Sequence, residues 1–217
     1  MGPHGWTAFN TDHRFLPQRW LRRIRAIALA LLFVGLSIAP SATQAATAKV
    51  HVYLMRGFLN VLSLGMDEIE AQLRQQGINA TVHSHLAWRI VADEAAVDYK
   101  SGRVRTIILV GHSLGAGAVT DMVARLGELG VPVKLAIGLD PAFHATVSGR
   151  VGHYTNYYVS SGFGQTIERG PGLRGTLQNV DVTKPPFVGP LAGIVHLNIE
   201  KNQAMQARVI REIRAAI

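Results

Sequence analysis

The sequence contains no cysteine among its 217 residues, which excludes disulfide bonds, thiolate metal sites and cysteine redox chemistry. Charged residues make up only 17% of the chain and hydrophobic residues 48%, which excludes a disordered polymer. The 22 glycines and 9 prolines are too few for a collagen-like or low-complexity chain. No HExxH pattern and no cluster of Asp and His at metal-ligand spacing is present, so we expect neither a metal nor a cofactor. The composition is that of a globular domain.

Basic residues outnumber acidic ones and give the chain a formal net charge of +8 at neutral pH. Half of this excess lies before residue 49, where several arginines accompany the single acid Asp12. The remaining Lys and Arg are dispersed along the chain and form no stripe on one helix. Because nucleic-acid binding needs a concentrated basic surface, we expect no nucleic-acid partner.

Residues 1–48 have the layout of an export signal. Arginines precede a run of uncharged residues, 26–39, which ends at Pro40. A membrane-spanning helix needs about 20 apolar residues, whereas the apolar part of a signal peptide needs about 7 to 15. Small residues follow and supply cleavage sites near 45–48. We therefore expect a periplasmic or secreted protein with no stable transmembrane anchor after cleavage; the alternative is a membrane anchor formed by an uncleaved N-terminal segment.

The remaining residues, 49–217, alternate between short apolar runs and segments of helical periodicity. Three of the runs are nearly continuous in apolar residues, as in strands buried on both faces of a parallel sheet. This alternation predicts a single α/β domain whose mostly parallel, twisted sheet is covered by helices on both faces. The Gly- and Pro-rich stretch 162–193 predicts long loops near a substrate pocket. The predicted strands are 50–55, 80–84, 104–111, 133–140 and 153–160, and the predicted helices are 66–73, 85–100, 116–129 and 200–216.

A G-x-S-x-G motif, residues 111–115, joins a predicted strand directly to a predicted helix. Both glycines are needed because the backbone turns so sharply that a Cβ atom would collide with the neighbouring strand and helix. Such a turn raises the hydroxyl of Ser113 above the sheet edge and exposes it, and the following helix directs N–H groups toward an oxyanion formed there. The motif predicts a nucleophilic serine; the alternative is a small-residue turn with a capping serine.

A serine nucleophile needs a base, and the base needs a carboxylate to orient it. Asp140 ends the next predicted strand and is therefore expected on the same edge of the sheet as Ser113. His196 lies in a predicted loop before the last helix, which gives the order Ser, Asp, His. The other histidines fit this role less well; His112, for example, is expected to face away from the serine oxygen.

The oxyanion needs two N–H donors, one from the residue after the nucleophile and one from the loop after the first strand. We predict that these donors are the backbone N–H groups of Leu114 and Phe58. Gly57 allows the backbone to approach the reacting carbonyl, and Arg56 or Asn60 is expected to fix the loop or to bind the substrate.

These motifs resemble those of the α/β-hydrolase superfamily over residues 49–217. GHSLGAG together with GLDPA is particularly similar to the branch of pancreatic lipases and phospholipases A1, in which the acid follows the strand after the nucleophile. The resemblance implies an α/β-hydrolase fold and ester hydrolysis through a covalent acyl-serine, with Ser113, Asp140 and His196 as the triad. The chain differs from those lipases in having no disulfides and a small or absent lid, because only a short segment separates Asp140 from His196.

Asp181 is an alternative acid, as in the commoner arrangement that places the carboxylate on a later strand. We expect a hydrolase of carboxylic esters or thioesters that acts on a small-molecule or lipid ester. Loops around Phe143, Phe163 and Phe187 would suit an acyl chain; the alternative is that these side chains belong to the core. The alternatives are a non-catalytic binding protein that retains the turn and an acyltransferase that passes the acyl group to an alcohol.

Overall fold

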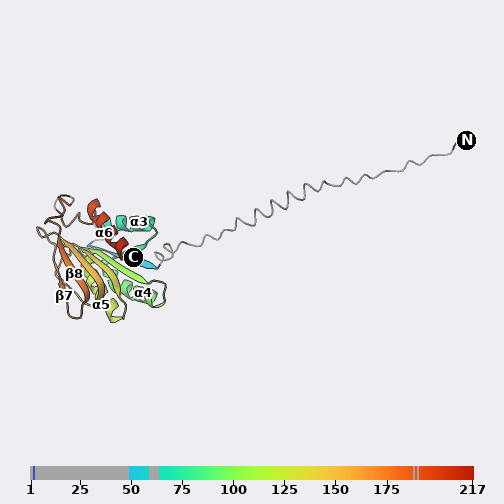
Figure 1. Ribbon diagram of the computed structural model, residues 1–217, viewed down its shortest axis with the longest axis horizontal. Helices are drawn as coiled ribbons and strands as arrows, with labels where there is room; N and C mark the ends of the chain where they lie inside the picture. Colours follow the sequence, from blue (N-terminus) through green and yellow to red (C-terminus); the bar gives the residue numbers. More distant parts are fainter. Residues whose placement is uncertain (1, 3–48, 59–63, 188, 190) are drawn as a thin grey trace. The chain divides into compact units, whose positions relative to one another are not determined.

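Six parallel strands form the central sheet of the computed structural model (Figure 1). Every neighbouring pair in this sheet runs in the same direction, so each connection between neighbours must cross over the sheet. In spatial order the strands are β2 (Asn79–Ser84), β1 (Val50–Arg56), β3 (Thr106–His112), β4 (Val133–Leu139), β6 (Arg150–Tyr158) and β8 (Arg174–Asp181).

The structure describes residues 2, 49–58, 64–187, 189 and 191–217. Apart from Gly2, these residues belong to one unit of the chain. The predicted leader, its cleavage site and Asn60 lie outside the described residues and stay predictions. Within the described part, no helix combines the length and the apolar character that a membrane crossing requires.

Helices cover both faces of the sheet (Figure 1). Successive side chains of a strand point to opposite faces of the sheet and so belong to two separate apolar cores. Along β1, for example, Leu54 packs with one pair of helices and Met55 packs with the other. Burial on both faces explains why the strand sequences are nearly continuous in apolar residues. One core contains α3 (Gly65–Gln75) and α6 (Gln203–Ala216), and the other contains α4 (Trp88–Lys100) and α5 (Leu114–Glu128).

The chain changes its direction of travel across the sheet between β1 and β3. From β1 it passes outward to β2, and α4 then returns it to β3 on the other side of β1. Ligands of parallel sheets bind at such a switch point, beyond the carboxyl ends of the strands. In the register of this sheet Met55 lies beside Gly111, and His112 lies beside Leu139. The segments that follow β1, β3 and β4 therefore meet at one edge.

The α/β class and all five predicted strands are confirmed, and so are the four predicted helices. The prediction of long loops over 162–193 is wrong in part, because this stretch contains β8 and also β7 (Ile167–Arg169). β7 pairs with β5 (Ala145–Val147) in a separate two-stranded sheet. β8 was not predicted because its sequence is polar. It is an edge strand whose residues are mostly exposed, so it needs no apolar pattern. The predicted helix 85–100 begins with a short 3-10 turn, η1 (His85–Ala87), before α4.

The two outer glycines of the G-x-S-x-G motif pack against main-chain atoms. A Cβ atom on Gly111 would lie 2.2 Å from the carbonyl oxygen of Gly115, and one on Gly115 would lie 2.1 Å from the carbonyl oxygen of Met55. The start of α5 therefore lies directly against the end of β1, as the motif predicts. Gly117, in the same helix, has open space at its Cβ position.

We expect Gly115→Ala to lower the free energy of unfolding by about 2–3 kcal/mol, because the added methyl group must displace main chain and not a flexible side chain. Gly117→Ala should raise the same quantity by up to about 1 kcal/mol, because alanine is the better helix former. Equilibrium denaturation of the two variants measures both effects. Equal stabilities would contradict the close packing of α5 on β1.

Candidate active site

Ser113 occupies the turn between β3 and α5 in a backbone conformation that few residues adopt. Its φ is 57° and its ψ is −118°, which is strained for a residue with a side chain. Its N–H donates to the carbonyl oxygen of Leu139 over 2.9 Å, so the turn is tied to the end of β4. The residue is only 6% exposed, which corrects the expectation of an exposed hydroxyl. Neighbouring loops, including the one that carries His196, cover it.

A chain of two hydrogen bonds links Ser113 to Asp140 through His196. The serine Oγ lies 2.9 Å from Nε2 of His196, and Nδ1 of the same ring lies 2.8 Å from Oδ2 of Asp140. Because a carboxylate only accepts, Nδ1 carries the proton and Nε2 is left to accept the serine proton. The three residues predicted for the triad are therefore brought together, although Asp140 is 56 positions before His196 in the chain.

Asp140 is fully buried and held by its neighbours on both carboxylate oxygens. Its Oδ1 accepts the N–H of Val159 over 2.7 Å, while Oδ2 accepts from His196. Its backbone has a φ of 50°, and its own N–H donates to the carbonyl oxygen of Tyr157. A Cβ atom on Gly164 would lie 1.6 Å from Oδ1, so the loop after β6 can close over this carboxylate only with a glycine.

The alternative acid, Asp181, has different partners. It lies at the end of β8, where its Oδ1 accepts the N–H of Thr183 over 2.9 Å and the hydroxyl of the same residue over 2.6 Å. These bonds close a local turn. The ring of His196 is bonded to Asp140 and not to this carboxylate.

The residues predicted to surround an oxyanion lie at the same edge. Leu114 is the first residue of α5, and Gly57 and Phe58 directly follow β1, the neighbour of β3. The carbonyl oxygen of Gly57 accepts from Nδ1 of His85 over 3.2 Å, which fixes this loop against η1. Arg56 forms an ion pair with Asp67 of α3, with Nε 3.0 Å from Oδ2. Of the two roles predicted for Arg56, this geometry favours fixing the loop.

Sequence analysis missed a buried acid behind the triad, Glu200. Its side chain is fully buried, and Oε2 lies 3.6 Å from Nε2 of His112. The same His112 nitrogen donates to the carbonyl oxygen of His196 over 2.9 Å. Burial raises the pKa of Glu200 from 4.5 to about 7 and lowers the pKa of His112 from 6.5 to about 4. A single glutamate next to Lys201 gave no sign of burial in the sequence.

Large apolar side chains are exposed in the segments that follow the carboxyl ends of the strands. Phe163 is 75% exposed, and its ring meets that of His196 edge-on, with centroids 6.1 Å apart. The edge of the sheet that carries the triad is therefore also strongly apolar. The other exposed apolar residues of these segments are Phe58, Leu64, Leu86, Phe143, Val195 and Leu197.

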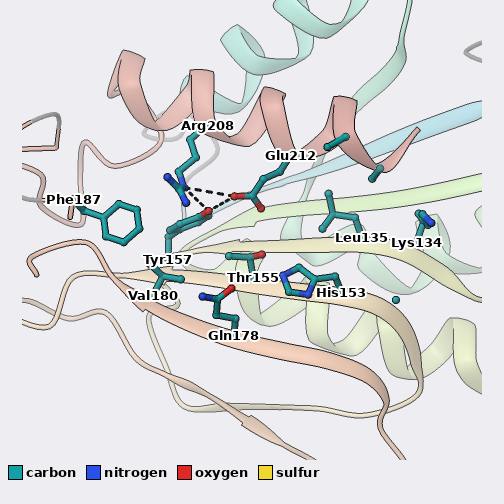
Figure 2. A pocket seen from close by; sticks show the side chains of 13 residues that line it. Lys134, Leu135, His153, Thr155, Tyr157, Gln178, Val180, Phe187, Arg208 and Glu212 are labelled. Atoms are coloured by element: carbon teal, nitrogen blue, oxygen red, sulfur yellow. Dashed lines mark hydrogen bonds and ion pairs between the residues drawn. The ribbon is translucent and has the colours of Figure 1, made fainter. Parts of the chain in front are cut away.

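Figure 2 shows a cavity of about 500 Å³ between α6 and the sheet. Its lining includes Tyr157, whose hydroxyl is hydrogen-bonded to Arg208 and Glu212 (Figure 2). Phe187 lines the same cavity and meets the ring of Tyr157 edge-on at 6.5 Å. Ser113, Asp140 and His196 do not line this cavity. Phe187 therefore lies in a different place from Phe163, whose ring contacts that of His196.

Neither a scan against protein-family models nor a search of curated proteins finds a match. Within residues 49–58, 64–187 and 191–217, no group of three or more His, Asp or Glu side chains is arranged to hold a metal ion. The function is therefore argued from the geometry of the site.

We expect Glu200→Gln to change how stability depends on pH. The carboxyl binds its proton more tightly in the folded state, so the wild type loses stability as pH rises from 4.5 to about 7. The variant lacks this loss, and its advantage in unfolding free energy over the wild type should grow by about 3 kcal/mol between pH 4.5 and 8. Denaturation at a series of pH values measures it. The exposed Glu128→Gln control should show no such trend, and a flat difference for Glu200→Gln would contradict its burial.

Proposed function

We propose that this protein is a serine hydrolase that cleaves carboxylic esters or thioesters through an acyl-serine intermediate. The observation that carries the proposal is the continuous hydrogen-bonded path from Ser113 through His196 to Asp140. A structural serine at a turn has no need of a histidine whose other nitrogen is bonded to a buried carboxylate. The arrangement matches the requirements of an activated nucleophile: a base within hydrogen-bond reach and a third group that orients the base.

In the acylation step, Oγ of Ser113 attacks the carbonyl carbon of the ester while Nε2 of His196 takes the hydroxyl proton. Asp140 stabilises the imidazolium that results. The oxyanion receives N–H groups from Leu114 and from the loop after β1, and each such donor contributes roughly 3 kcal/mol in the transition state. When the tetrahedral intermediate collapses, the bond to the leaving alcohol or thiol breaks, and His196 returns the proton to it.

Deacylation repeats the same steps with water as the nucleophile. His196 takes a proton from water, the resulting hydroxide attacks the acyl-serine carbonyl, and Ser113 leaves with the proton. An alcohol that entered in place of water would make the protein an acyltransferase. Product analysis in the presence of added alcohol distinguishes these outcomes.

The proposal includes membership of the α/β-hydrolase superfamily, and the arrangement of the sheet supports it. The nucleophile follows a central strand, the acid follows the neighbouring strand β4, and the histidine comes last in the chain. The oxyanion loop follows β1, on the other side of β3. These positions support the resemblance to lipases whose acid follows the strand after the nucleophile.

The apolar edge of the sheet supports a substrate with an apolar acyl group. Exposed apolar side chains are concentrated in the loops around the site, with Phe163 beside the ring of His196. Surface patches of this kind mark binding sites for apolar ligands. We therefore propose lipid esters or other acyl esters as the substrate class.

Ser113→Ala should abolish both reaction with a fluorophosphonate probe and hydrolysis of p-nitrophenyl esters, because the phosphorus or carbonyl centre then has no nucleophile. Losses of this kind reach roughly 10⁶-fold in kcat in other triad enzymes. Gel fluorescence and release of p-nitrophenol give the two readouts, across esters of increasing chain length. A folded wild type that neither reacts with the probe nor hydrolyses any ester would overturn the proposal in favour of a non-catalytic binding protein.

Substitution of the two candidate acids should give different results. Asp140→Asn leaves His196 without a carboxylate to stabilise its positive form, and we expect kcat to fall roughly 10³- to 10⁴-fold. Asp181→Asn changes a carboxylate that interacts with Thr183 and Ser160 and not with His196, so kcat should stay within about two-fold of wild type. Steady-state kinetics on one ester measures both. A large loss in Asp181→Asn with little effect in Asp140→Asn would contradict the assignment of the acid.

A further inference from the structure

His112 and Glu200 are buried beside the triad, yet the reaction cycle above uses neither of them. Within the part of the chain that the structure describes, both carboxylate oxygens of Glu200 lack a hydrogen-bond partner. An ionisable side chain in this situation costs stability, because burial removes its hydration without a full replacement. The nearest cations or imidazoles are His112 at 3.6 Å and Lys201 at 3.8 Å.

The backbone of Glu200 is held on two sides, which keeps the carboxyl group in this position. A Cβ atom on Gly65, the first residue of α3, would lie 2.2 Å from the carbonyl oxygen of Glu200 and 2.7 Å from its Cγ. Gln206 of α6 donates to the same carbonyl oxygen over 2.9 Å. The helices on this face of the sheet therefore fix Glu200 against the loop that carries His196.

His112 connects this buried carboxyl group to the catalytic histidine. Its Nε2 donates a hydrogen bond to the carbonyl oxygen of His196 over 2.9 Å. The same nitrogen lies 3.6 Å from Oε2 of Glu200. The rings of His112 and His196 have their centroids 5.2 Å apart. A negative charge on Glu200 therefore acts on His196 in two ways, through the His112 N–H and through space.

We propose that Glu200 is a positioning residue of this site, which acts through His112 and whose ionised carboxylate favours the imidazolium form of His196. The inference rests on the proposed function, because only acyl transfer requires His196 to become positively charged at Ser113. With Glu200 ionised, the positive charge that develops on His196 has a second nearby anion besides Asp140. Glu200 and the charged form of His196 attract each other, and this attraction is stronger at a partly buried site than in water.

The charged groups that face Glu200 decide when it ionises. Lys201 and the charged form of His196 favour the carboxylate, and Glu68 on α3 opposes it. His112 is kept neutral by its own burial, which lowers its pKa. Since burial raises the pKa of Glu200 to about 7, the carboxylate should form between about pH 6 and 8. The activity should therefore depend on an ionisation in this range that belongs to Glu200.

The test is the rate at which a fluorophosphonate probe labels Ser113 between pH 5 and 9. In the wild type we expect the labelling rate to rise with an ionisation between about pH 6 and 8 that Glu200→Gln lacks, and the final rate of the variant to be about 3- to 10-fold lower. Glu212→Gln, a matched loss of a carboxyl group on α6, should keep the wild-type profile. His112→Ala removes the connection and should also lower the final rate. A Glu200→Gln profile that superimposes on the wild type would overturn the inference.

A second measurement tests the effect of Glu200 on the protonation of His196 in a protein that cannot turn over substrate. NMR titration of the His196 ring in Ser113→Ala and in Ser113→Ala/Glu200→Gln should show that the ring loses its proton at a lower pH in the double variant, because a nearby anion is lost. Proton loss at the same pH in both variants would overturn the inference while leaving the hydrolase proposal standing. A wild type that the probe does not label would overturn the hydrolase proposal itself, and the inference with it.

Discussion

The arrangement of this site depends on main-chain contact between the start of α5 and the carboxyl end of β1. Gly115 allows the helix to approach the carbonyl oxygen of Met55 so closely that no side chain fits between them. The turn before the helix must then be sharp, and Ser113 adopts a φ of 57°. The same turn hydrogen-bonds to Leu139 at the end of β4, directly before Asp140. One packing contact thus sets the positions of three neighbouring strand ends.

Two carboxyl groups near His196 have opposite surroundings. Asp140 accepts hydrogen bonds on both oxygens, from Val159 and from His196. Glu200 is equally buried, but neither of its carboxylate oxygens has a hydrogen-bond partner among the described residues. Pairs of acids whose environments separate their pKa values are common where an enzyme assigns them different roles. In our account Asp140 orients His196 at all times, whereas Glu200 contributes only when it is ionised.

Local sequence features were sufficient to predict the sheet and the three residues that hydrogen bonds connect at its edge. Continuous apolar runs marked the buried strands, and two glycines at fixed spacing marked the turn at Ser113. Asp140 followed from the rule that strand ends meet at one edge of a parallel sheet, and His196 followed from its place after Ser113 and Asp140 in the chain. β8 and Glu200 were not predicted, because their roles depend on distant contacts. The polar strand β8 is held by pairing with β6, and Glu200 is buried by α3 and by His112, which are far away in the sequence.

The central claim is that Ser113, His196 and the N–H groups at the strand ends act together on one tetrahedral centre. The most direct measurement is a crystal structure of the protein after reaction with a phosphonate, whose phosphorus imitates that centre. We expect the phosphorus to be bonded to Oγ of Ser113, with one oxygen within hydrogen-bond distance of the Leu114 N–H and of an N–H at Gly57 or Phe58. An adduct on another residue, or an oxygen directed away from both of these donors, would contradict the account.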